Sequence, residues 1–186
     1  MSEDTQVTDV AQGPSPTDWA YAAGFVDGEG CIAVTRSFVR ERGKFYYGVV
    51  VVVANRDRPV LEWFRGIWSG LVVSVSPDRP GLARDAWNWR SPVGQSAESF
   101  LRGIRPWLRI KTKQCDNALA MIELLRRSRR TLGPNPMPRA WLEQQERLYW
   151  IQRELNHRGS GAFVKEPMHS PRRINRDRAI AASRGV

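Results

Sequence analysis

The pattern of hydrophobic and polar positions divides the chain into helical and extended segments. From residue 15 to residue 29, small and apolar side chains recur at helical spacing. Apolar and polar residues then alternate from 31 to about 40, with Ile32 and Val34 on one face, which predicts a half-buried strand. Residues 45–54 are so rich in valine that they predict a second strand without indicating which of its faces is buried.

The following residues predict a helix at 58–68, strands at 71–76 and 84–90, and a helix at 95–103. Two more helices are predicted after these, the last at 138–156. The order α-β-β-α-β-β-α with extra C-terminal helices predicts an α+β fold. Its two antiparallel hairpins are expected to form one four-stranded sheet, with helices on one face and the other face uncovered.

The two ends of the chain differ in composition from its middle. Residues 1–14 are polar, acidic and without pattern, and we expect a disordered arm there. Ser15 can then cap a helix that has Pro16 in its first turn, which marks the start of the folded part. Residues 15–157 are predicted to be a single domain. Residues 158–186 carry seven basic residues against two acids and predict a basic, flexible tail.

The composition favours a polyanionic partner. The 186 residues carry a formal net charge of +10, and the sequence pI is about 10.5. No apolar run is long enough to predict a membrane span, and we expect no small-molecule substrate. Cys31 and Cys115 are too few for a zinc cluster and are expected to be free thiols. The strong preference for arginine over lysine favours a cytoplasmic protein of bacterial or phage origin.

The most specific stretch is Ala-Ala-Gly-Phe-Val-Asp-Gly-Glu-Gly at residues 22–30, at the end of the first helix. Small residues form one stripe along this helix at about 100° per residue, namely Ala20, Ala23, Gly24 and Asp27. Such a stripe lets another backbone approach closely, whereas Tyr21, Phe25 and Val26 are expected to face the core of their own chain. The glycines let the backbone leave the helix sharply, so that Glu29 lies beside the start of a strand.

This stretch resembles the signature of the LAGLIDADG homing endonucleases in its Gly-Phe-Val-Asp-Gly-Glu-Gly form. The resemblance extends from about Asp18 to Leu125 and implies a saddle-shaped sheet whose uncovered face binds DNA. In that family the final acid of the signature holds the catalytic metal. The resemblance therefore implies that Glu29 binds Mg²⁺, with the backbone carbonyl of Gly28 as a second oxygen ligand. Asp27 is expected to cap the end of the partner helix.

The signature is found once in the chain, and the resemblance therefore implies a homodimer. Cutting both strands of DNA needs two sites, and a twofold axis supplies the second one. The expected dimer interface is the stripe of small residues, Ala20, Ala23, Gly24 and Asp27.

Two further segments match features of the family. Asn55 ends the second strand where family members place an amide that positions the attacking water, although it also suits the cap of the next helix. Residues 107–114 resemble the stretch that carries the catalytic lysine, which implies a catalytic role for Lys111 and a phosphate contact for Lys113. The alternative for this pair is two solvated lysines at the start of a helix.

We expect the uncovered face of the sheet to lie in the major groove. The side chains expected to face DNA are Thr35, Ser37, Arg40, Arg42, Lys44, Ser74, Ser76, Arg84, Asn88 and Arg90. The sequence thus predicts a site-specific endonuclease that hydrolyses double-stranded DNA at a long, pseudo-palindromic target with a divalent metal. The alternatives are a non-cleaving nucleic-acid-binding protein of the same fold, either an intron maturase or a DNA-binding regulator, and a structural protein with a basic surface.

Overall fold

The computed structural model describes residues 13–75, 86–132 and 137–157. Its elements are α1 (Pro16–Glu29), β1 (Gly30–Val39), η1 (Arg40–Arg42), β2 (Lys44–Asn55), α2 (Arg58–Trp68), β3 (Leu71–Val75), β4 (Ala86–Arg90), α3 (Gln95–Ile104), η2 (Arg105–Trp107), α4 (Thr112–Leu132) and α5 (Arg139–Leu155). This order confirms the predicted α+β series with extra C-terminal helices. The arm predicted at 1–14 lies almost wholly outside the described residues, and so does the tail predicted at 158–186.

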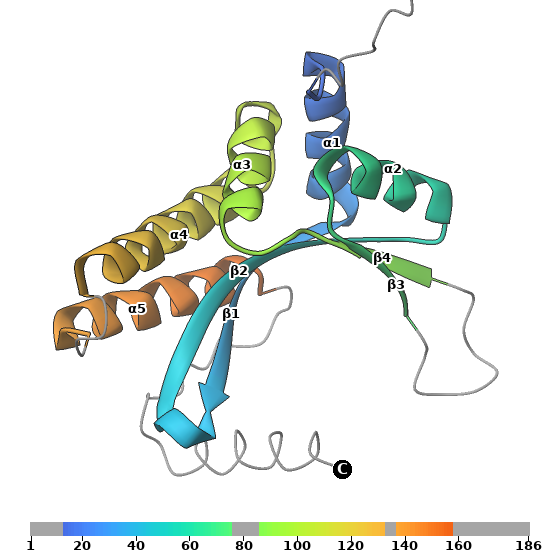
Figure 1. Cartoon of the computed structure of the whole chain (residues 1–186). Helices are drawn as coiled ribbons and strands as arrows, with labels where there is room; N and C mark the ends of the chain where they lie inside the picture. Colours follow the sequence, from blue (N-terminus) through green and yellow to red (C-terminus); the bar gives the residue numbers. More distant parts are fainter. Residues whose placement is uncertain (1–12, 76–85, 133–136, 158–186) are drawn as a thin grey trace, which may run out of the picture.

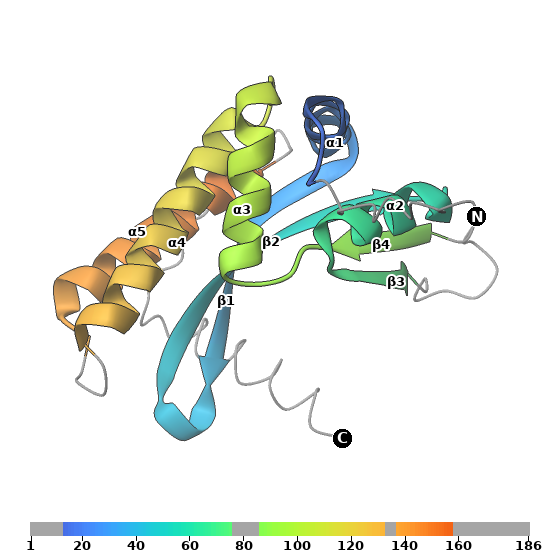
Figure 2. The ribbon, with the colours of Figure 1, turned by 45° about the horizontal axis from the view of Figure 1, so that its top comes forward.

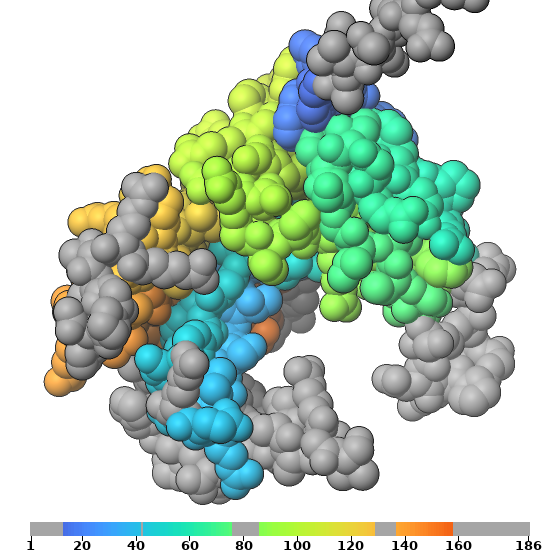
Figure 3. Space-filling view, viewed as in Figure 1, coloured from blue at the N-terminus to red at the C-terminus, as the bar shows by residue number. Residues whose placement is uncertain are grey.

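The four strands form one antiparallel sheet in the order β1-β2-β4-β3. Figure 1 shows the sheet as an arch with α1, α2 and α3 on its upper side. The hairpin of β1 and β2 is long, with ten residue pairs from Gly30 opposite Val53 to Val39 opposite Lys44. In Figure 3 this hairpin protrudes below the helical body of the molecule. The predicted four-stranded sheet with helices on one face is therefore confirmed.

The first helix begins as its sequence predicts. The hydroxyl of Ser15 accepts a hydrogen bond from the backbone N–H of Asp18 at 3.2 Å, and the Asp18 carboxylate accepts one from the Ser15 N–H at 2.8 Å. This reciprocal pair satisfies donors that have no partner within the helix. The bonds from Ser15 lower the pKa of Asp18 below its usual value. The capping box fixes where α1 starts.

The strand pairing gives the valine-rich strand β2 the orientation that its periodicity could not. Directly opposite residues of an antiparallel pair lie on the same side of the sheet. Val49 and Val51 lie opposite Val34 and Ile32, and all four are buried against the helices. The intervening residues, among them Val52, therefore face the open side of the sheet.

The pairing of β3 with β4 corrects one expectation. Ser74 lies opposite Trp87, which is two residues from the wholly buried Trp89 and therefore on the helix side of the sheet. Ser74 thus belongs to the covered side, and the prediction that it faces DNA is wrong. Strand β3 places Leu71, Val73 and Val75 on its open side instead. Its Leu-Val-Val-Ser-Val sequence has no alternation that would have indicated this.

Helix α5 packs beside β1, the edge strand of the sheet, as the views in Figures 1 and 2 agree. Gln152 and Asn156 both donate side-chain N–H groups to the backbone carbonyl of Ile32, at 2.6 and 2.8 Å. Arg36 of β1 forms an ion pair with Glu146 of α5 at 3.1 Å, with side chains only 4% and 11% exposed. These contacts tie the C-terminal helix to the strand that follows α1.

The carboxylate of Glu146 is the centre of a buried polar cluster. It also accepts hydrogen bonds from the hydroxyl of Tyr47 and from the indole N–H of Trp150. Burial and the bond to Glu146 raise the pKa of Tyr47 above its usual value. Removal of one partner from such a buried ion pair is strongly destabilising, because it leaves the other charge buried without a partner.

Within the described residues, no helix combines the length and apolar character needed to cross a membrane.

Candidate functional site

The C-terminal end of α1 is joined to the start of α4 through Asp27. Its carboxylate accepts three backbone hydrogen bonds, from the N–H groups of Arg109, Ile110 and Lys111, at 2.7, 3.2 and 2.9 Å. A negative charge at the N-terminus of a helix also interacts favourably with the helix dipole. The expectation that Asp27 caps a partner helix is therefore corrected, because its carboxylate caps a helix of its own chain.

Lys111 completes the same junction from the other side. Its ammonium group donates to the backbone carbonyl of Val26 at 2.9 Å and to that of Asp27. The last carbonyl groups of a helix have no partners within the helix, and a positive charge at this end is favourable. Lys111 is only 4% exposed. The carboxylate of Asp27 thus binds the backbone at the start of α4, and the ammonium group of Lys111 binds the backbone at the end of α1. We refer to this pair as the α1–α4 latch.

Glu29 lies just beyond the latch and is exposed. It lines a hollow of about 240 Å³, together with Gly28, Gly30, Cys31, Lys111 and Asn156. Gly30 is required here, because a Cβ atom at this position would lie 2.7 Å from the backbone of Val26. The absence of a side chain lets β1 leave α1 directly. The structure therefore brings together the predicted Glu29, Gly28 and Lys111.

Asn55 does not line this hollow. It lies opposite Trp87, on the helix side of the sheet, and its side-chain oxygen accepts a hydrogen bond from the N–H of Asp57 at 2.8 Å. This local bond forms an Asx-type turn that leads the chain into α2, but the N-cap of α2 is Asp57, so Asn55 is not the helix cap that its position suggested. The bond favours a local structural role for Asn55 over the positioning of water at Glu29. The amide that does line the hollow is Asn156, at the end of α5. No motif in the sequence indicated Asn156, because it lies 127 positions after Glu29 in the chain.

The exposed face of α1 differs from the predicted stripe. Ala23 is wholly buried in its own chain, whereas Tyr21, expected in the core, is 52% exposed. A shallow hollow of about 440 Å³ runs along the helix and is lined by Ala20, Tyr21, Gly24, Phe25, Gly28 and Glu29. Of the predicted interface residues, Ala20 and Gly24 line this exposed face, while Ala23 and Asp27 pack or bind within the chain.

The open face of the sheet carries several of the residues predicted to meet DNA. Thr35, Ser37, Lys44 and Arg90 are exposed, and Asn88 is half-buried. Arg40 is exposed at the hairpin tip, and Lys113 is exposed in the first turn of α4. Ser76 and Arg84 lie outside the described residues, as does the side chain of Arg42.

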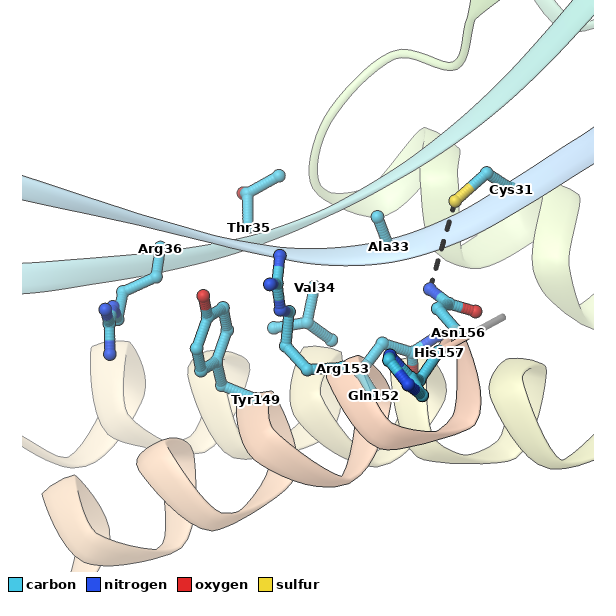
Figure 4. A pocket seen from close by; sticks show the side chains of 10 residues that line it. All are labelled: Cys31, Ala33, Val34, Thr35, Arg36, Tyr149, Gln152, Arg153, Asn156 and His157. Carbon is cyan, nitrogen blue, oxygen red and sulfur yellow. Dashed lines mark hydrogen bonds between the residues drawn. The ribbon is translucent and has the colours of Figure 1, made fainter. Parts of the chain in front are cut away.

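A larger hollow of about 530 Å³ lies where α5 passes the edge of β1. Figure 4 shows Ala33 and Thr35 pointing away from α5, while Val34 and Arg36 point toward it. The sulfur of Cys31 faces Asn156 at the end of α5, whose side-chain N–H donates to it at 3.9 Å. Arg153 and His157 line the hollow from the side of α5 and are both exposed. The open face of β1 is thus free of helix at Ala33 and Thr35, whereas Asn156 reaches Cys31 from the end of α5.

The donor set at Glu29 fits a hard divalent cation. A carboxylate and a backbone carbonyl, from Glu29 and Gly28, are the oxygen ligands that Mg²⁺ prefers. Both residues line one hollow at the exposed end of α1. Among the described residues, no group of three or more His, Cys, Asp or Glu side chains comes together to form a metal cluster.

Comparison with known proteins identifies the fold. No protein-family model and no curated protein matches the sequence. The solved structures that match include the homing endonuclease I-CvuI in complex with the I-CreI target, at 19% identity and a TM-score of 0.60 over 80% of this chain and 87% of that one. The archaeal intron-encoded homing endonuclease I-Vdi141I, complexed with DNA, matches at 15% identity and a TM-score of 0.61 over 90% and 96%. The LAGLIDADG homing endonuclease I-GzeII, in complex with its DNA target, matches at 13% identity and a TM-score of 0.55 over 84% and 54%.

The chain therefore has the fold of the LAGLIDADG homing endonucleases. It spans nearly the whole of two of these relatives and about half of the third. One signature and one four-stranded sheet agree with the single-motif type of this fold.

Proposed function

We propose that the protein is a metal-dependent, site-specific endonuclease that cuts double-stranded DNA as a homodimer. The observation that carries the proposal is the placement of Glu29. This carboxylate is exposed at the end of α1, in a hollow that Lys111 also lines. The fold is that of proteins solved in complex with DNA, and the formal charge of +10 favours a polyanionic partner.

Each group of the hollow has a role in this proposal. Glu29 and the carbonyl of Gly28 would hold Mg²⁺, with phosphate oxygens and water as the remaining ligands. The bound ion would polarise the phosphate and lower the pKa of a coordinated water. Lys111 contributes positive charge beside the hollow, which offsets negative charge developing on the phosphate. The latch holds Val26 and Asp27 at the end of α1 and so fixes the backbone from which Glu29 projects.

The dimer would form through the exposed face of α1. Gly24 faces open space, since a Cβ atom placed there meets no atom within 4 Å. Two copies of this helix could therefore approach closely about a twofold axis and bring two Glu29 carboxylates to opposite strands of one duplex. The substitution Gly24→Leu is compatible with the folded chain for the same reason. We expect light scattering to find a dimer for the unmodified protein and a folded monomer for Gly24→Leu.

The proposal is tested with DNA libraries. The protein is incubated with randomised duplexes in Mg²⁺, and newly created ends are captured and sequenced. We expect one family of long, nearly palindromic sites, with cleavage abolished by EDTA. Sites enriched by binding in Ca²⁺ that are never cut in Mg²⁺ would reject the nuclease and leave a DNA-binding protein. Absence of any enriched sequence would reject both.

The second candidate is a non-cleaving nucleic-acid-binding protein of the same fold. Two observations favour it. The ammonium group of Lys111 is already bound to carbonyl groups of α1, and Asn55 is turned to the covered side of the sheet. The retained exposure of Glu29 is the reason to prefer the nuclease, since a carboxylate that faces a phosphate weakens binding unless a cation lies between them.

A further inference from the structure

The open face of the β1–β2 hairpin changes character along its length. Next to Glu29 the paired residues on this face are Cys31 with Val52 and then Ala33 with Val50. We call these four residues the inner apolar strip. The next pairs outward are Thr35 with Gly48, Ser37 with Tyr46 and Val39 with Lys44.

The two halves of this face offer different chemistry to a bound molecule. The four side chains of the inner apolar strip are small aliphatic groups and one thiol, and none of them is an amide, a carboxylate or a guanidinium. The Cys31 sulfur accepts a long hydrogen bond of 3.9 Å from the side chain of Asn156 at one border of the strip. The outer pairs present hydroxyl groups at Thr35, Ser37 and Tyr46 and an ammonium group at Lys44. The change falls between one pair and the next, at Ala33 and Thr35.

The surroundings of the inner apolar strip favour nucleic acid over an apolar protein surface. Arg90 lies opposite Val52 on the same open face and is exposed. Lys44 lies at the other end of the hairpin, with its ammonium group 5.4 Å from the centre of the Tyr46 ring. Arg90 beside the strip and Lys44 at the outer end of the same face complement an occupant that is anionic at its borders and apolar between them.

The major groove of DNA has this character only where thymine is present. Its edge carries hydrogen-bonding groups on every base, but thymine adds a C5-methyl group that projects into the groove. Contact of an apolar side chain with guanine or cytosine leaves polar atoms without partners, which weakens binding. Contact with the thymine methyl buries apolar surface on both sides.

We propose that the inner apolar strip selects thymine, through its methyl group, in the base pairs next to the cleaved phosphates. This inference rests on the proposed function, since it concerns the DNA that the same face binds. Residues on one face of a strand are roughly 6.6 Å apart, which corresponds to about two base pairs. The two apolar pairs therefore cover about four base pairs of each half-site, and preferences that depend on hydrogen bonds lie farther out.

The test changes only the methyl group. A site is first selected from randomised duplexes by binding to the full chain in Ca²⁺. Deoxyuridine, which lacks the methyl and keeps every hydrogen-bonding group of thymine, then replaces thymine in the inner four base pairs of each half-site. The control duplex carries the same number of replacements in the outer base pairs. We expect affinity by fluorescence anisotropy to fall roughly threefold to fivefold for each inner methyl in contact, and to change little for the outer ones.

Two protein variants connect the effect to the strip. Val50→Thr keeps the shape and strand preference of the side chain but adds a hydroxyl, and it should reduce the penalty for inner deoxyuridine. Ser37→Ala, two pairs farther out on the same face, should leave that penalty unchanged and alter preferences only in the outer base pairs. Thermal unfolding checks that both variants are folded. If Val50→Thr fails to fold, the deoxyuridine series on the unmodified protein decides the matter.

The outcomes separate this inference from the function on which it rests. A selected duplex that is bound equally well with and without the inner methyl groups overturns the inference and leaves the DNA-binding function standing. An inner window that contains no preferred thymine does the same. Failure to enrich any duplex overturns both.

Discussion

The two acids at the end of α1 lie two residues apart and have opposite environments. Asp27 is turned into the chain, where its carboxylate accepts three backbone N–H bonds at the start of α4. Glu29 is turned out, is exposed, and lines a hollow. The difference follows from helical geometry, because residues two positions apart point in directions about 200° apart.

Within three residues, one acid stabilises the fold and the other is the residue proposed to bind the metal. The inward acid stabilises the junction of two helices, and its charge is matched by helix dipole and backbone donors. The outward acid has no such role among the hydrogen bonds of the described residues and is free to bind a cation. Substitutions at the two positions should therefore change different measurable quantities.

The largest effect is expected from Glu29→Gln. The amide keeps the shape of the side chain but removes the charge that a cation requires, so cleavage of a selected site in Mg²⁺ should slow by a factor of at least about 10². Thermal stability should remain unchanged, and DNA affinity in EDTA should remain similar or rise. Glu41→Gln removes the same charge from the exposed hairpin tip and should cut at the parent rate. Parent-rate cutting by Glu29→Gln would place the metal elsewhere.

Asp27→Ala should have its main effect on the stability of the protein rather than on cleavage. Loss of the carboxylate leaves three backbone donors without their acceptor, and we expect a loss of about 2–3 kcal/mol in the free energy of unfolding by denaturant titration. Asp27→Asn keeps one acceptor oxygen and should lose roughly half as much. The comparison fails if Asp27→Ala is as stable as the parent and only cleavage suffers, since Asp27 would then act in the site itself.

Only part of the environment of these two acids follows from the sequence. Ser15 and Pro16 indicated where α1 begins, and the glycines indicated that it ends at Glu29, beside the start of β1. The destination of Asp27 was assigned to the wrong helix because a capping acid does not reveal which helix it caps. The partner N–H groups come 82 to 84 positions later in the chain, and only the folded arrangement brings them together.

The other wrong or missed predictions have the same cause, because local sequence does not reveal contacts between segments far apart in the chain. The helices α1–α5 and the strands β1–β4 were expected in their observed order, because apolar runs, helix caps and turn residues mark each of them locally; the short helices η1 and η2 were not expected. The face of Ser74 was wrong because β3 is apolar on both sides. Asn156 was missed because a polar residue at the end of an amphipathic helix carries no local sign that it reaches β1.

Lys111→Met should give an intermediate result, because Lys111 belongs to both sides of the comparison. Loss of the ammonium group removes two hydrogen bonds to α1 carbonyl groups and should reduce the free energy of unfolding by about 1–2 kcal/mol. Cleavage should also slow, by more than the stability change explains. The control is Lys113→Met, which removes the same charge from an exposed position and should change only DNA affinity. Equal behaviour of the two variants would remove Lys111 from the site.

The smallest effect is expected at the opposite end of α1. Ser15→Ala removes the cap and should lower the unfolding midpoint by about 2–4 °C without changing cleavage. Hydrogen bonds from Ser15 lower the pKa of Asp18, so this contribution is present above the ordinary carboxyl pKa and is lost as the pH falls through the lowered value. The difference in midpoint between variant and parent should therefore shrink in acid, and a difference that stays constant down to pH 2 would exclude Asp18 as its source.

The covering of the β1 edge by α5 has a consequence for the solubility of the folded chain. A ten-residue strand at the edge of a sheet can recruit a strand from another molecule and so start aggregation. Two amide side chains of α5 occupy the Ile32 carbonyl on that edge, and the buried ion pair of Arg36 with Glu146 keeps the helix in place. The C-terminal helix thus protects this edge of the sheet from pairing with a strand of another molecule, which leaves the exposed face of α1 for the dimer contact proposed above.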